Sequence, residues 1–187
     1  MVASTTKKIV FVVVLIAIAI IWRLVNHTYN FAPNLELITA ASVLAAVTIG
    51  LRAAVVVSLF TIIVSDLMIG NSSIFIFTWS SFLLIGLCAF SLKKLNQKPK
   101  KQVLCSAGFA IVSSFIFFAI TNFGVWLQGW YAPTWAGLTE CFIMAIPFYR
   151  TMLIGNLILV PSTIAAWQFV RIRQAAKNSV VNSFVRD

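Results

Sequence analysis

Acidic residues are scarce in this sequence. Its 187 residues include four Asp and Glu side chains in total, and one of them is the final Asp187. The sequence contains no HExxH, GxSxG or Walker A motif and no dense carboxylate cluster, so the usual sites for zinc hydrolysis, acyl transfer and phosphoryl transfer are missing. We therefore predict that the protein is not an enzyme.

Histidine and cysteine are nearly as scarce. The single His27 cannot supply both axial ligands of a bis-histidine haem within one chain. The three cysteines, Cys88, Cys105 and Cys141, form no CxxC pair and no Cys/His cluster with the spacing of a metal site. We expect the cysteines to be packing residues, and we predict no metal and no cofactor.

Charged residues of both signs make up only 10% of the sequence, whereas a soluble domain has about a quarter. Hydrophobic residues make up 61%, and the mean hydropathy is +1.00. A net charge of +10 is typical of a nucleic-acid-binding protein when the basic residues share one polar face, but here they separate long apolar runs. The composition therefore predicts an integral membrane protein in contact with the lipid bilayer and no nucleic-acid partner.

Six apolar runs are long enough, or nearly so, to cross a bilayer as helices of about 20 residues. We predict a single all-α membrane domain, 1–187, with six transmembrane helices at residues 9–25, 35–49, 53–69, 74–92, 103–121 and 151–170. The second of these is the shortest. The sequence has no internal repeat of the kind that indicates an inverted-repeat transporter.

The basic residues predict the orientation. If the N-terminus is placed inside, every Lys and Arg except Arg23 and Arg150 falls in an inner segment, as the positive-inside rule requires. The inner loop 93–102 alone contains five lysines. We therefore predict that both termini are cytoplasmic. A cleaved signal peptide is the less favoured alternative, because Trp22 and Arg23 follow the first apolar run without a polar cleavage region.

The outer loop predicted between the last two helices, residues 122–150, is rich in aromatic and charged groups. It includes Trp126, Trp130, Tyr131, Trp135, Glu140 and Arg150. Residues 136–146 are apolar, too short to span and followed by Pro147, so we predict an interfacial or re-entrant helix there. Two interpretations of the tryptophans stay open: an aromatic belt at the membrane surface, or the mouth of a pocket whose rings stack on a planar ligand.

Polar residues near the outer ends of the predicted helices are candidates for a binding site. Asp66 lies late in the third helix, where a carboxylate is costly unless it is paired or hydrated. It could instead cap the turn at residues 71–73, or pair with Arg150 and hold the outer loop shut. Asn34 and Glu36 fit the N-cap and first turn of the second helix. The predicted ligand-binding residues are Asn34, Asp66, Asn122, Trp126, Trp130, Glu140 and Arg150.

Small residues recur every four positions in the second predicted helix. Ala41 and Ala45 form one row, and Ser42, Ala46 and Gly50 form another. Such a stripe lets two helices approach closely. It serves either packing within the bundle or the docking of a separate partner helix, for which the predicted residues are Ala41, Ala45, Ala46 and Gly50.

Four blocks of the sequence carry a resemblance to a known group. NFAPNLELITAASVLAA, SDLMIG, TNFGVWL and GLTECFIMAIPFYRTMLIGN resemble an uncharacterised family of small bacterial integral membrane proteins described as transport proteins. That family is in turn similar to the substrate-capture (S) components of energy-coupling factor transporters. The resemblance covers residues 30–156. It implies a six-helix bundle in the bacterial cytoplasmic membrane, a vitamin-sized ligand near the outer face, and a transmembrane coupling protein and two cytoplasmic ATPases as partners.

The resemblance also implies a site, which would draw on Asn34, Asp66, Asn122, Trp126, Glu140 and Arg150. The sequence departs from the pattern twice. The small-residue stripe lies on the second predicted helix instead of the first, and Asn156 stands where related sequences have an acid after the glycine of the last helix.

Taken together, these features favour one function over another. We expect a protein that captures a small, vitamin-like nutrient as the substrate-binding subunit of a transporter. The alternative is a structural or accessory subunit of a larger membrane complex that docks through the Trp-rich outer loop.

Overall fold

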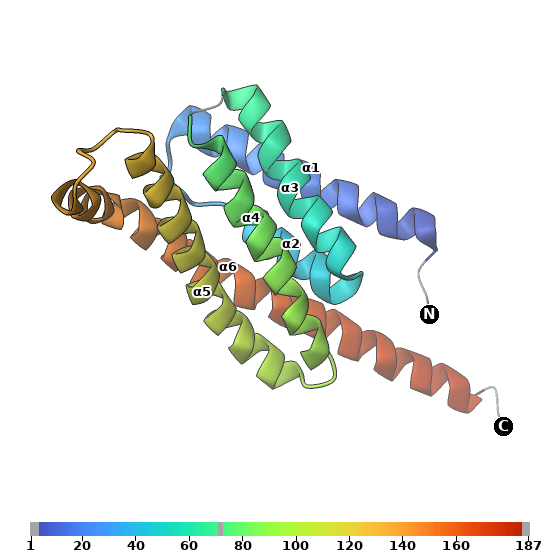
Figure 1. Cartoon of the computed structure of the whole chain (residues 1–187). Helices are drawn as coiled ribbons and strands as arrows, with labels where there is room; N and C mark the ends of the chain where they lie inside the picture. The colour runs from blue at the N-terminus through green and yellow to red at the C-terminus, as the bar shows by residue number, and fades with distance from the viewer. Residues whose placement is uncertain (1–3, 71–72, 185–187) are drawn as a thin grey trace.

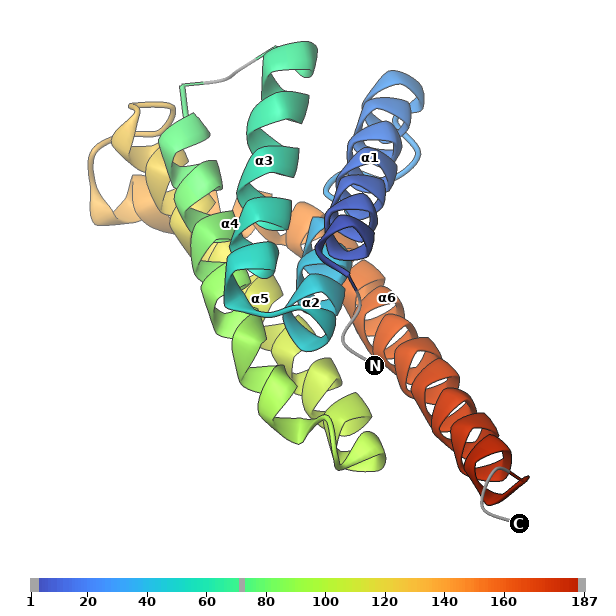
Figure 2. The same cartoon turned by 90° about the vertical axis from the view of Figure 1, so that its right-hand side faces the viewer.

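The ordered elements of the protein are helical throughout the part of the chain that the structure describes. The computed structural model describes residues 4–70 and 73–184. The elements are α1 (Thr5–Tyr29), α2 (Ile38–Thr48), α3 (Leu51–Ile69), α4 (Phe75–Ala89), the 3-10 helix η1 (Phe90–Leu95), α5 (Pro99–Leu127) and α6 (Trp135–Phe184). For these residues the all-α prediction is confirmed. Figure 1 shows the helices in one bundle, and Figure 2 shows the C-terminal part of α6 extending past it.

Five helices have the length and apolar composition of membrane spans, namely α1, α3, α4 continued by η1, α5 and α6. In contrast, α2 has 11 residues, which is about 16 Å at 1.5 Å per residue, and it cannot cross a hydrocarbon core of about 30 Å. The prediction of a full transmembrane helix at residues 35–49 is therefore wrong. This run is apolar because nine of the 11 residues of α2 are buried among other helices, and hydropathy alone does not distinguish such burial from exposure to lipid.

Both ends of α2 are stabilised by side chains of the same chain. At its first turn, the Glu36 carboxylate accepts hydrogen bonds from the Thr39 backbone N–H at 2.8 Å and from the Thr39 hydroxyl at 2.5 Å. At the other end, Lys93 Nζ donates to the Ile49 carbonyl at 2.7 Å. An acid at the start of a helix and a base at its end both complement the helix dipole. These contacts satisfy backbone groups that a buried helix end would leave unpaired.

The segment between α1 and α2, residues 30–37, turns back into the bundle without forming a helix. Asn34 lies within it in the left-handed region, at φ 62°. It is therefore not the N-cap that its spacing predicts, because α2 begins four residues later and Glu36 provides the capping oxygen. This conformation places the Asn34 side chain at the surface of the segment and not against the helix start.

Two side chains of α1 hold this segment in place. Trp22 Nε1 donates to the Leu35 carbonyl at 3.0 Å. Asn26 Nδ2 donates to the carbonyls of Ala32 and Leu35 at 2.9 and 3.1 Å, and the Ala32 N–H donates back to Asn26 Oδ1 at 3.1 Å. On the side of α6, Gly155 allows the close approach, because a Cβ there would overlap Leu35 Cδ1. The path of the backbone is thus set from both sides.

The small residues of α2 face other helices of the same chain. Ala41 and Ala45 are buried in a cluster with residues of α1 and α3, and Ala46 is fully buried in a second cluster that includes residues of α4 and α6. Gly50 lies in the turn to α3 at φ 143°, which residues with a side chain rarely adopt. Because the bundle itself buries Ala41, Ala45 and Ala46 and Gly50 lies in a turn, the predicted docking of a separate partner helix on these four residues does not fit the structure.

The outer loop predicted at residues 122–150 is mostly helical. The helix α5 continues to Leu127 and α6 begins at Trp135, so the non-helical connection is residues 128–134. The prediction placed the end of α5 where its apolar run meets polar residues. A helix does not have to end at such a point, because its hydrogen bonds join backbone groups whether the side chains are apolar or polar.

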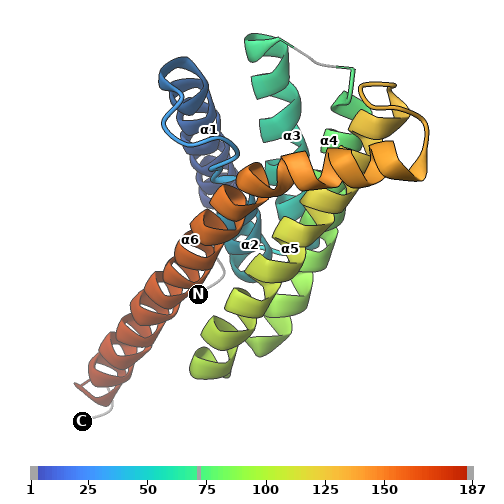
Figure 3. The ribbon, with the colours of Figure 1, turned by 90° about the vertical axis from the view of Figure 1, so that its left-hand side faces the viewer.

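Residues 136–146, predicted as a separate interfacial or re-entrant helix, form the first part of α6. This helix continues through Pro147 and Pro161, because a proline inside a helix removes one backbone hydrogen bond and bends the helix without always ending it. Figure 3 shows the first part of α6 crossing the bundle beside α5 and the remainder running away at an angle. The prediction of a helix here is confirmed, and the predicted break at Pro147 is wrong.

Candidate functional site

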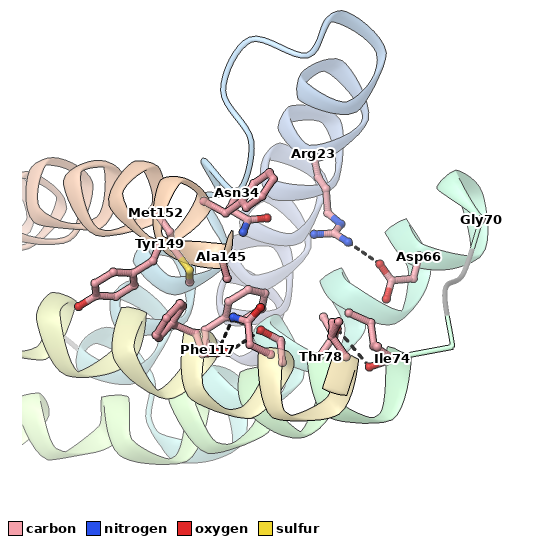
Figure 4. A pocket seen from close by; sticks show the side chains of 15 residues that line it. Arg23, Asn34, Asp66, Gly70, Ile74, Thr78, Phe117, Ala145, Tyr149 and Met152 are labelled. Carbon is pink, nitrogen blue, oxygen red and sulfur yellow. Dashed lines mark hydrogen bonds and ion pairs between the residues drawn. The ribbon is translucent and has the colours of Figure 1, made fainter. Parts of the chain in front are cut away.

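A cavity of about 290 Å³ lies at one end of the bundle. Its walls come from the end of α1 and the segment after it, the end of α3, the start of α4, the last turns of α5 and the first part of α6 (Figure 4). Its polar lining residues are Arg23, Asn34, Asp66, Thr78, Thr121 and Asn122, and its aromatic ones are Phe117, Phe118, Phe148 and Tyr149. The volume is near the lower end of small-molecule pockets, which is about 300 Å³.

An ion pair forms the polar wall of the cavity. Arg23 Nη2 of α1 lies 2.5 Å from Asp66 Oδ1 of α3. Trp79 of α4 donates from Nε1 to the other carboxylate oxygen, Oδ2, at 2.8 Å. Asp66 is only 6% exposed, and a carboxylate so buried is tolerated when it is paired and hydrogen-bonded in this way. One carboxylate thus connects three helices.

The guanidinium of Arg23 has N–H donors that are not used within the described part of the protein. A guanidinium carries five N–H donors; among the described residues one hydrogen bond joins Arg23 to Asp66, and the buried Arg23 Nε has no partner. Figure 4 shows the second terminal nitrogen pointing away from Asp66, toward the side of the cavity where Asn34 lies. Both oxygens of Asp66, in contrast, already accept a hydrogen bond. The polar wall therefore offers a ligand more donors than acceptors.

The last turns of α5 add hydrogen-bond acceptors to the cavity. The Thr121 hydroxyl donates to the Phe117 carbonyl at 2.7 Å, so toward a ligand it can only accept. Asn122 Nδ2 donates to the Phe118 carbonyl at 2.7 Å, which leaves the amide oxygen and one N–H of this side chain. A ligand that accepts from Arg23 can therefore donate to α5.

Aromatic rings line the side of the cavity away from the ion pair. Figure 4 shows Tyr149 at the far side from Arg23 and Asp66. The rings of Tyr149 and Phe118 have centroids 4.8 Å apart at 39°, and Phe118 also meets Phe142 edge to face at 5.3 Å. Rings that fix one another in this way present flat apolar faces. The cavity is thus polar at one side and aromatic at the other.

Three of the predicted ligand-binding residues share this cavity: Asn34, Asp66 and Asn122. They come from three separate parts of the chain, which the fold brings together. Trp126 and Trp130 instead line a second groove of about 390 Å³ at the connection between α5 and α6. Trp126 is fixed there, since its Nε1 donates to a backbone carbonyl of that connection at 3.0 Å.

The two charged residues predicted on the outer loop lie away from the cavity. Glu140 and Arg150 are exposed on α6, and neither lines the cavity. Asp66 is paired with Arg23, so the alternative of a pair between Asp66 and Arg150 does not fit the structure. The other alternative, that Asp66 caps a turn at residues 71–73, falls partly on residues 71–72, which lie outside the described residues.

Sequence reasoning missed the partner of Asp66. In the charge pattern, Arg23 is only an exception to the positive-inside rule. A cation near the outer end of the first predicted helix and a carboxylate near the outer end of the third are, however, the signal of a pair, since intramembrane charges tend to pair with each other. The aromatic residues Trp79, Phe118 and Tyr149 gave no comparable signal, because each has other aromatic residues near it in the sequence.

No three His, Cys, Asp or Glu side chains within the described ranges come close enough together to hold a metal ion. The cysteines are free thiols, and Cys141 is buried with its Sγ 3.3 Å from the Asn122 carbonyl. What the cavity itself offers is hydrogen bonds, one ion pair and flat apolar faces.

Residues 3–179 match the profile of a family of unknown function, DUF6580, and the chain belongs to that family. No curated protein and no solved structure matches the chain.

Proposed function

We propose that the protein captures a small, vitamin-like nutrient within the membrane and serves as the substrate-binding subunit of a transporter. The observation that carries this proposal is the two-sided cavity, with the unused donors of Arg23 on one side and the rings of Phe118 and Tyr149 on the other. A molecule with a flat ring system and a carbonyl, ring nitrogen or carboxylate as acceptor fits both sides. Capture of this kind requires no bond-breaking chemistry from the protein.

The basic residues support an outward-facing cavity. The cavity lies where α1, α3 and α5 end and α4 begins. The opposite ends of these helices hold Lys8 at the start of α1, Arg52 at the start of α3, and Lys93 and Lys100 around the connection from α4 to α5. By the positive-inside rule, that opposite end and both termini belong in the cytoplasm of a bacterial cell. The cavity then opens to the outside, where a nutrient arrives.

The first part of α6 is suited to act as a lid. It contributes Ala145, Phe148, Tyr149 and Met152 to the cavity lining. With the cavity facing outward, this part of α6 lies at the outer membrane surface, in the position of an interfacial helix. Pro147 within it interrupts the backbone hydrogen bonds, so a change of bend at this point would open or close the cavity.

Release of the ligand into the cell requires an energy source that this chain does not contain. On the strength of the resemblance to S components, we propose a transmembrane coupling protein and cytoplasmic ATPases as partners. The small-residue stripe of α2 is buried, so these partners would contact another surface of the bundle.

Retention of a small molecule by the intact protein tests the proposal. The full chain is extracted from its own membrane in mild detergent and measured by native mass spectrometry. We expect a bound small molecule on the wild type and its loss in Ala145→Phe, since Ala145 is 7% exposed and lines the cavity. The matched control is Ala136→Phe, at an exposed position of the same helix, and it should keep the ligand. Equal occupancy in both variants, or a wild type that carries no small molecule in its native membrane extract, would refute capture.

The alternative function, a structural or accessory subunit of a larger complex, is favoured by one observation. Trp130, within the connection between α5 and α6, and Trp135, the first residue of α6, are 63% and 83% exposed. Large exposed aromatic residues are common at protein interfaces and at membrane surfaces. In the same experiment, a stable multiprotein assembly that dissociates in Trp130→Ser but not in Ala145→Phe would support this function over capture.

A further inference from the structure

A long apolar groove runs along the outside of the bundle between α1 and α3, apart from the cavity described above. Its volume is about 460 Å³. On the α1 side its apolar walls are Ile9, Val12, Val13 and Ile16, and on the α3 side they are Ile49, Ala53, Val56 and Phe60. Within the bundle, no side chain covers Ile9, Val13 or Phe60, which are more than half exposed.

The groove has cations at one end only. Because α1 and α3 run in the same direction, their first turns lie at the same end of the groove (Figure 2). Lys8 and Arg52 line it there, and none of its described lining residues is acidic. No side chain caps the start of α3, whose N-cap is Gly50, so the free N–H groups of that helix add partial positive charge. The far end of the groove is entirely apolar.

The length of the groove matches one leaflet of a bilayer. From Thr5 to Ile16 the α1 wall extends about 16 Å at 1.5 Å per residue. The hydrocarbon core of a bilayer is about 30 Å thick, so the groove covers about half of it. Its cationic end then falls at the level of the lipid head groups, and its apolar end falls near the middle of the membrane.

We propose that this groove is a binding site for one anionic phospholipid. An acyl chain lies along the apolar walls, and the head-group phosphate lies between Lys8 and Arg52. A zwitterionic lipid would bring its own cation toward these two residues, so the site discriminates by charge. A partner helix is a poorer match, because it would have to end in an acidic residue at that level to answer the same two cations. The proposal is independent of the capture function.

Lipid selectivity of the purified full chain tests this site. The protein in mild detergent is given equal amounts of phosphatidylglycerol and phosphatidylcholine with identical acyl chains, and retained lipids are counted by native mass spectrometry. We expect phosphatidylglycerol to exceed phosphatidylcholine about tenfold at low salt, since two basic residues near an anionic head group each contribute severalfold. The ratio should fall as salt is raised, because salt screens exposed charges.

Two pairs of variants locate the effect. Lys8→Gln with Arg52→Gln should bring the lipid ratio close to one, whereas Lys100→Gln with Lys101→Gln changes the net charge equally, lies outside the groove and should leave the ratio unchanged. Val56→Trp fills the apolar part of the groove without touching a charge, and it should reduce the retention of both lipids. Its control is Ile111→Trp, at an exposed position on α5.

Three results would overturn the proposal. The first is a wild-type ratio near one, and the second is an equal loss of selectivity in the Lys100 and Lys101 pair. The third is a dimer or a bound protein that Val56→Trp abolishes, because the groove would then belong to a protein partner. If the Lys8 and Arg52 pair does not remain monodisperse in detergent, the salt dependence of the wild type and the Val56→Trp comparison still decide the matter.

Discussion

The helices α1 and α2 are both apolar and follow each other in the chain, yet they lie in opposite surroundings. All residues of α1, Thr5–Tyr29, are described, and Ala19 alone among them is buried, whereas nine of the 11 residues of α2 are buried. The exposed positions of α1 carry large side chains such as Ile9, Val13 and Ile18. The buried positions of α2 carry mainly Ala, Ser, Thr and Val. In this chain, the size of the side chains separates the exposed helix α1 from the helix α2, which is buried among other helices.

The polar residues of α2 do not disturb this arrangement, because they are satisfied locally. The Ser42 hydroxyl donates to the Ile38 carbonyl at 2.7 Å, and the Thr48 hydroxyl donates to the Leu44 carbonyl at 2.6 Å. Hydroxyls bonded to their own helix can be buried at little cost. α2 therefore resembles a membrane span in hydropathy although it is an internal helix of half the length.

The largest expected effect comes from adding volume to α2. Ala45 is fully buried between α1 and α3, so Ala45→Leu should destabilise the protein by about 3 kcal/mol, at the upper end of the usual overpacking range. Val13→Leu on the exposed face of α1 is the control and should leave stability unchanged. Thermal unfolding in detergent, followed by circular dichroism, measures both. Equal stability of the two variants would mean that α1 and α2 do not differ as described.

A smaller effect is expected where α1 is attached to the bundle by charge. Asp66→Ala leaves the Arg23 guanidinium without its partner, and we expect a loss of about 2 kcal/mol, because the charge is partly buried. Replacing both residues, Arg23→Met with Asp66→Leu, should restore most of the stability, since no unpaired charge is left. Unfolding in detergent measures the coupling between the two sites. Full additivity of Arg23→Met and Asp66→Leu, each also measured alone, would show that the pair does not connect α1 to α3.

The capping carboxylate of α2 should contribute less. Glu36→Ala removes the acceptor of two hydrogen bonds from Thr39, and we expect a loss of about 1.5 kcal/mol, which is typical of a lost N-cap. Glu36→Gln keeps an acceptor oxygen and should recover part of that loss. Hydrogen exchange of the α2 amides is the measurement, because the first turn should open before the rest of the helix. Unchanged exchange in Glu36→Ala would remove the capping role.

The smallest effect is expected at the other end of α2. Lys93→Met removes the donor to the Ile49 carbonyl, and we expect a loss of about 0.5 kcal/mol, as for other charges at a helix end. Lys94→Met, at the exposed neighbouring position, is the matched control. The same unfolding measurement applies. A loss in the control equal to that in Lys93→Met would assign the effect to net charge and not to the contact with α2.

Much of the fold could be predicted because apolar runs of sufficient length must be helical in a membrane. The prediction failed at α2, since a run of Ala, Ser, Thr and Val has the same hydropathy in lipid as inside a bundle. It also failed at the ends of α5 and α6, where helices continue through Asn122 and Pro147. A change of hydropathy alters the surface of a helix without ending it. A single proline can bend a helix and still let it continue.

The candidate site could be predicted in part. Asn34, Asp66 and Asn122 stood out as polar residues in or beside apolar runs, and the cavity contains all three. The pairing of Asp66 with Arg23 was not predicted, because it depends on the packing of α1 against α3, which hydropathy does not report. Trp126 and Trp130 were predicted as ligand-binding residues because the outer loop is rich in tryptophan, but they line a different groove. Residue type indicated the polar side of the cavity and gave no indication of its aromatic side.

The way in which α1 holds the segment 30–37 has a consequence for how such a protein can change over generations. Every bond from Trp22 and Asn26 to this segment ends on a backbone carbonyl or N–H. The attachment to α1 therefore does not depend on which side chains the segment carries. Asn34, which faces the cavity, accepts or donates none of these bonds, so glycine or aspartate, which also tolerate its left-handed backbone, should replace it while the segment keeps its path. The lining of the cavity can in this way change at position 34 while the surrounding helices keep their packing.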